Sequence, residues 1–168
     1  MNIKLRSWQI ADVDSLAYYA NNAEIAKNLT NQFPHPYTRA NAEAFIGFAT
    51  SHTPTRIFAI DLDGEAIGGI GIHPQADVFE KNAELGYWLA QPFWGRGIIT
   101  QAVELIVPIA FETLPIQRLF ARPFGTNKAS QKILEKNNFV LEAVFEKTIY
   151  KNGEYLDEWV YARRRPTT

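Results

Sequence analysis

The feature that most constrains the fold is a stretch near the middle of the chain, residues 83–102. The Tyr, Trp and Leu at positions 87–89 favour an extended strand, and Pro92 cannot take part in a strand ladder, so the strand ends before it. Gly95 and Gly97 allow backbone angles that other residues resist, and they let a second group approach closely. The stretch therefore predicts a strand, a tight turn and the start of a helix.

The start of that helix suits an anion, because the first N–H groups of a helix have no partner within it and its dipole is positive there. Arg96 adds a cation at the same place. The spacing is neither a dinucleotide fingerprint, because position 100 is Thr, nor a P-loop, because no Lys-Ser or Lys-Thr follows. Local spacing alone leaves open a phosphate site and a turn without a ligand.

Four segments together resemble the GNAT superfamily of acetyl-CoA-dependent N-acetyltransferases, and within it the RimJ/RimL-type branch. They are Glu-Leu-Gly-Tyr-Trp-Leu (84–89), Pro-Phe-Trp-Gly-Arg-Gly (92–97), Asn-Lys-Ala-Ser (127–130) and Leu-Glu-Lys-Asn-Asn-Phe (134–139). The resemblance covers nearly the whole chain, from Leu5 to Asp157. Pro92 stands where many GNAT enzymes have Gln or Arg, a departure that the branch often tolerates.

The resemblance implies that acetyl-CoA is the co-substrate and that the glycine loop binds the pyrophosphate of coenzyme A. It assigns twelve residues to the cofactor: Trp88, Leu89, Trp94, Gly95, Arg96, Gly97, Ile98, Ile99, Thr100, Asn127, Ser130 and Lys132. The matching Asn binds the pantetheine arm, and the matching Ser lies near the thioester sulfur as a catalytic residue. Simpler roles stay open: a helix N-cap for Asn127, a first-turn serine for Ser130 and a solvated side chain for Lys132.

Acetyl transfer to an amine also requires that the amine lose a proton. Glu84, in the strand before the glycine loop, is the candidate catalytic base or the residue that orients a water. The alternative is a carboxylate that pairs with a Lys or Arg or only holds the loop together. Some relatives carry a carboxylate where this chain has Ile149, which favours Glu84 or a water relay, and Glu146 is a weaker substitute.

Five aromatic or imidazole side chains are expected to contact the acceptor: Phe33, His35, Tyr37, Tyr150 and Tyr155. The first three lie in a Pro-rich loop that could equally be a surface loop packed by its own aromatics. An α-amine has a pKa of about 8 and a lysine side chain about 10.4, so an enzyme with one carboxylate base suits α-amines better.

The expected acceptor is therefore the α-amine of a protein or peptide N-terminus, as in a ribosomal-protein-alanine acetyltransferase. The alternatives are a small-amine acetyltransferase, acting on an amino acid, polyamine or aminoglycoside, and a non-catalytic acyl-CoA-binding module with the same fold.

Composition and charge exclude several other classes of function. The 168 residues carry a net charge of −1, which provides no broad field for nucleic acid or anionic lipid. The chain has no cysteine, and its three histidines are scattered, so we expect no metal site. No apolar run approaches the length of a membrane span, and residues 1–6 are too short and too charged for a signal peptide, so we expect neither feature. We expect one cytoplasmic domain over residues 1–168, either a monomer or a homodimer.

Periodicity and turn signals predict a mixed α/β (α+β) GNAT fold: a single twisted, mostly antiparallel sheet with a central, splayed parallel strand pair and about four flanking helices. The expected strands are 3–6, 56–62, 65–73, 83–89, 118–122, 139–150 and 155–162. The expected helices are 12–20, 38–51, 98–113 and 127–137, with a further helical piece at 23–29. Asp63-Gly64 and Asn152-Gly153 predict two hairpins.

Overall fold

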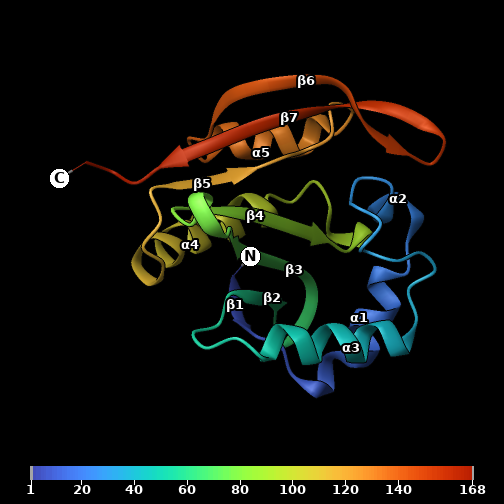
Figure 1. Cartoon of the computed structure of the whole chain (residues 1–168). Helices are drawn as coiled ribbons and strands as arrows, with labels where there is room; N and C mark the ends of the chain where they lie inside the picture. Colours follow the sequence, from blue (N-terminus) through green and yellow to red (C-terminus); the bar gives the residue numbers. More distant parts are fainter. Residues whose placement is uncertain (1, 168) are drawn as a thin grey trace. The chain divides into compact units, whose positions relative to one another are not determined.

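The computed structural model describes residues 2–167 (Figure 1). Its strands are β1 (Ile3–Ser7), β2 (Ile57–Leu62), β3 (Glu65–Pro74), β4 (Asn82–Leu89), β5 (Arg118–Ala121), β6 (Val140–Lys151) and β7 (Glu154–Arg164). Its α-helices are α1 (Val13–Ala20), α2 (Ala23–Ala26), α3 (Arg39–Thr50), α4 (Ile98–Thr113) and α5 (Lys128–Lys136). Short 3₁₀ turns are η1 (Ile10–Asp12), η2 (Asp77–Phe79) and η3 (Gln91–Phe93).

The strands form one sheet in the order β1-β2-β3-β4-β5-β7-β6. β4 and β5 pair in parallel, with Glu84 opposite Phe120, whereas β5–β7 and β6–β7 pair antiparallel. The predicted fold class is confirmed. The further helical piece predicted at 23–29 is the single-turn helix α2, whose first turn the Asn22 side chain caps. α4 continues through Pro108.

The chain divides into two compact units, and each is described by itself. The first contains the residues up to 71 and residues 87–106, and the second contains residues 72–86 and those from 107 onward. The chain passes from one unit to the other within β3, β4 and α4. No helix within residues 2–167 is long and apolar enough to span a membrane.

In the first unit, α1 and α3 lie side by side (Figure 1). Their apolar stripes, represented by Leu16 and Ile46, are buried against Trp8 and the inner face of β2. Thr38 caps α3, since its hydroxyl accepts a hydrogen bond from the Asn41 N–H at 3.2 Å. Burying these side chains removes apolar surface from water, which supplies most of the stabilisation of this unit.

The glycines of β3 are explained by close packing. A Cβ added at Gly68 would lie 2.5 Å from the Trp88 carbonyl oxygen, and one at Gly69 would lie 2.7 Å from the Trp88 indole nitrogen. The β2–β3 register also shifts between Ile60 and Asp61. This shift marks a bulge in the β2–β3 pair, beside the close contact with Trp88.

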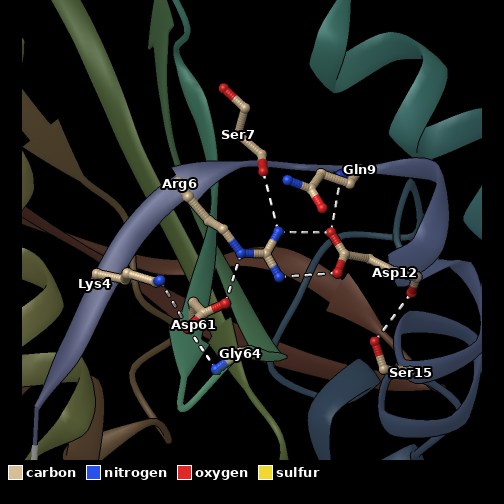
Figure 2. Close-up of polar contacts among 8 residues, drawn as sticks. All are labelled: Lys4, Arg6, Ser7, Gln9, Asp12, Ser15, Asp61 and Gly64. Carbon is tan, nitrogen blue, oxygen red and sulfur yellow. Dashed lines mark hydrogen bonds and ion pairs between the residues drawn. The ribbon is translucent and has the colours of Figure 1, made fainter.

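A buried ionic cluster ties β1 to β2 and η1 (Figure 2). The Arg6 guanidinium donates to Asp61 at 2.6 Å and to both oxygens of Asp12 at 2.8 and 2.9 Å. The Gly64 N–H also donates to Asp61, at 2.9 Å. Burial acts to raise the pKa of Asp61, but the hydrogen bonds from Arg6 and Gly64 outweigh it, so the pKa lies below its usual range.

In the second unit, α5 lies along β7 (Figure 1), and the Tyr161 hydroxyl donates to Glu135 of α5 at 3.0 Å. Asn138 follows α5 with a φ of 62°, the left-handed conformation that commonly ends a helix. Asn152 and Gly153 turn the β6–β7 hairpin with φ values of 51° and 81°. A bulge in β6 surrounds Lys147, whose N–H donates to Asp157 at 2.9 Å.

Candidate functional site: glycine loop, α5 N-terminus and the Arg122 pair

The glycine loop has the backbone that the sequence predicts. Gly95 and Gly97 have φ values of 75° and 74°, in the region that side chains resist. A Cβ built at either position meets no atom within 4 Å. The glycines are therefore required by the backbone angle, and the space beside them is open to a ligand. α4 begins at Ile98, directly after the loop.

Packing holds this loop in place. The Trp94 indole donates to the Leu89 carbonyl at 2.8 Å, and the Arg96 guanidinium lies 5.5 Å from the centre of the Phe93 ring. Ile98 and Ile99 are buried. The side chains of these two isoleucines and of Leu89 face the protein interior, so what they can offer a ligand is their backbone. Arg96 and Trp94 are exposed.

The Pro-rich loop of the first unit is packed by its own aromatics. The Phe33 ring lies 5.1 Å from the Tyr37 ring and 5.8 Å from the Trp88 ring. Tyr37 is buried, which raises its pKa to about 12. His35 is exposed. Contact of this loop with an acceptor stays a prediction; of the three predicted side chains His35 is exposed, Phe33 is half-buried and Tyr37 is buried.

The N-terminus of α5 carries the second predicted group. The Asn127 side chain accepts from the Ser130 N–H at 3.2 Å, so the N-cap role is confirmed. Ser130 is buried, whereas Lys132 points to solvent. The Lys128 ammonium lies 4.4 Å from the centre of the Trp159 ring, in a cation–π contact that fixes the first turn against β7.

Glu84 lies in a bidentate ion pair that the sequence reading did not assign. Arg122 Nε and NH2 donate to the two Glu84 oxygens at 3.0 and 2.9 Å. Arg122 NH1 lies 3.9 Å from Glu158 Oε1. The hydrogen bond to Glu84 raises the pKa of Arg122 despite the cost of burial. Arg122 lies two residues after Phe120, which pairs with Glu84 in the parallel ladder, so the strand register is needed to recognise this pair.

Tyr150 and Tyr155 face each other across the β6–β7 hairpin, with ring centres 5.0 Å apart, and both are exposed. Ile149, one residue before, is half-buried and apolar, as the sequence indicates. Within residues 2–167 no group of three or more His, Asp or Glu side chains could hold a metal ion.

Comparison with known proteins identifies the family to which this chain belongs. The family model described as the acetyltransferase (GNAT) domain matches residues 2–140. Three curated bacterial N-acetyltransferases are 30–34% identical to the chain, and the alignments span only 54–60% of their own length. One of them, the ribosomal-protein-serine acetyltransferase of Escherichia coli K12, is 30% identical over 108 residues, which is 64% of this chain.

Two further likenesses cover more of the chain. The spermidine N(1)-acetyltransferase of Escherichia coli K12 is 23% identical over 160 residues, 92% of this chain and 81% of that protein. The solved structure of RimL, a ribosomal L7/L12 α-N-protein acetyltransferase in complex with coenzyme A, has a TM-score of 0.85 and 22% identity, covering 98% of this chain and 94% of that one. The fold and the family match together show that the chain belongs to the GNAT acetyltransferases.

Proposed function

We propose that the chain transfers the acetyl group of acetyl-CoA to a primary amine. The observation that carries this is the glycine loop: two positive-φ glycines with open space beside them, immediately before the N-terminus of a sixteen-residue helix. Backbone N–H groups at such a place suit the pyrophosphate of coenzyme A. Arg96, exposed beside the loop, would add a charge-assisted contact.

Ser130 and Asn127 would serve the reactive end of the substrate. In this proposal Asn127 contacts the pantetheine arm while it caps α5, and Ser130 donates to the sulfur as the thiolate leaves. A thiol has a pKa of about 8.5, so one weak donor is enough for this step. The proposal is supported by the position of both residues in one turn of α5, held by the hydrogen bond between them.

For the acceptor we favour the α-amine of a protein or peptide N-terminus. At neutral pH roughly a tenth of such amines are uncharged, but well under a thousandth of lysine side chains are. One relative of this chain is named for a ribosomal protein, and another is named for spermidine, which keeps a small-amine acceptor as the second candidate.

A screen of amine acceptors with acetyl-CoA tests the proposal. Peptides with a free N-terminus, amino acids, polyamines and aminoglycosides are each incubated with the protein, and release of the coenzyme A thiol is measured. We expect release with N-terminal peptides above that with the same peptides blocked at the N-terminus. Release with polyamines alone would favour the second candidate, and release with none of the acceptors would contradict the proposed activity.

A further inference from the structure

Two carboxylates lie near Arg122, but only one of them is hydrogen-bonded to its guanidinium. Both oxygens of Glu84 accept hydrogen bonds from Arg122, at 3.0 and 2.9 Å. The nearest oxygen of Glu158 is 3.9 Å from Arg122, which is too far for a hydrogen bond. Both oxygens of Glu84 are thus bonded to the Arg122 guanidinium. Glu84 could accept a proton from an amine only if this ion pair were broken.

Glu158 is the carboxylate that lacks a donor. Among residues 2–167 no hydrogen bond reaches its side chain, although only 20% of that side chain is exposed. A carboxylate can accept about four hydrogen bonds, and the Glu158 oxygens are not among the fully buried, unpaired polar atoms of residues 2–167, so they stay open to water or to a ligand. The position therefore suits a group that brings N–H donors and positive charge.

The backbone around Glu158 is fixed on both sides. Glu158 pairs with Phe124 in an antiparallel bridge. The Gly125 N–H donates to the Asp157 carbonyl at 2.8 Å, and the Trp159 N–H donates to the Pro123 carbonyl at 3.1 Å. Glu158 is diagonal to Arg122 across the two strands, which places both side chains on one face of the sheet.

We propose that Glu158 binds the amine of the acceptor and takes its proton, while Arg122 and Glu84 form the fixed pair that positions it. This assignment rests on the proposed function. The protonated amine gives one proton to Glu158, and the neutral nitrogen then forms a bond to the thioester carbon as the carbon–sulfur bond breaks. The nitrogen loses a second proton, the departing thiolate of coenzyme A takes one up, and Glu158 returns its proton to water.

Matched glutamine variants test the assignment. Glu158→Gln keeps the volume of the side chain and removes its charge, and we expect a loss of roughly 100-fold in kcat/KM for the acceptor at neutral pH. The loss should shrink at alkaline pH, because the amine then arrives uncharged. Affinity for acetyl-CoA should stay within about twofold of wild type. Glu112→Gln, at an exposed position on α4, is the control for removal of one negative charge.

Glu84→Gln distinguishes the proposed roles of the two carboxylates, Glu84 and Glu158. If Glu84 only anchors Arg122, its loss should lower the rate equally at every pH and lower the unfolding temperature as well, whereas Glu158→Gln should leave unfolding nearly unchanged. A Glu158→Gln profile that matches an active wild type at every pH would overturn the assignment, and so would recovery at alkaline pH in Glu84→Gln alone. A wild type that acetylates no amine would instead overturn the proposed function and the assignment with it.

Discussion

Replacing the loop glycines by alanine separates backbone strain from ligand contact. Gly95 has a φ of 75° and an open surrounding, so Gly95→Ala creates no clash and adds only the strain of a left-handed residue. That strain is about 1–2 kcal/mol. For a chain of this size it should lower the unfolding temperature by roughly 2–8 °C. The same holds for Gly97, at 74°.

Affinity for coenzyme A should fall by more than this strain explains, because the new Cβ occupies the space in which the pyrophosphate would lie. We expect at least a tenfold weaker Kd, about 1.4 kcal/mol, by titration calorimetry at a temperature where every variant is folded. Gly64→Ala is the matched control: Gly64 has a φ of 95° and open space beside it, but lies in the β2–β3 turn. Equal Kd values for Gly64→Ala and both loop variants would refute the proposed pyrophosphate contact.

Three further predictions address the rest of the protein. Ser130→Ala should lower turnover more than it weakens acetyl-CoA binding, because the proposed hydroxyl donor acts as negative charge develops on the sulfur. Steady-state kinetics with a confirmed acceptor measures this, and an unchanged kcat would contradict it. Asn127→Ala should lose the helix cap, about 1 kcal/mol by denaturant unfolding, and weaken binding as well; an unchanged stability would contradict the cap. The pKa of Asp61 is depressed in the folded protein, so its contribution to stability is present above its unfolded pKa of about 3.9 and is lost as pH falls through the folded value. Asp61→Asn should therefore cost about 3–5 kcal/mol at neutral pH and flatten the loss of stability in acid, measured by unfolding at several pH values.

Local signals in the sequence predicted local structure well. The Asp-Gly and Asn-Gly pairs specify hairpins because few residues accept positive φ, and the structure has positive φ at Asp63, Gly64, Asn152 and Gly153. Thr38 and Asn127 cap helices through side-chain oxygens placed next to the first turn. These features depend on neighbours a few residues away, so they can be read without the fold.

Side-chain pairs between residues far apart in the sequence were not predicted. The Arg122–Glu84 pair joins positions 38 residues apart, and the Arg6–Asp61 pair joins positions 55 apart. Each requires the strand register, which a sequence pattern does not fix to the residue. The sequence therefore indicated Glu84 as important and left open whether it was free or paired. It gave no means to distinguish Glu84 from Glu158 as the carboxylate available to an amine.

The most direct test of the central proposal is to follow the acetyl group itself. A peptide with a free N-terminus and one internal lysine is incubated with acetyl-CoA and the wild-type protein, and fragmentation mass spectrometry locates the added acetyl group. We predict one acetyl group on the α-nitrogen, formed in proportion to released coenzyme A thiol and strongly reduced with Gly97→Ala. Tight binding of acetyl-CoA without acetylation of any peptide or small amine would contradict it and identify the chain as an acyl-CoA-binding module.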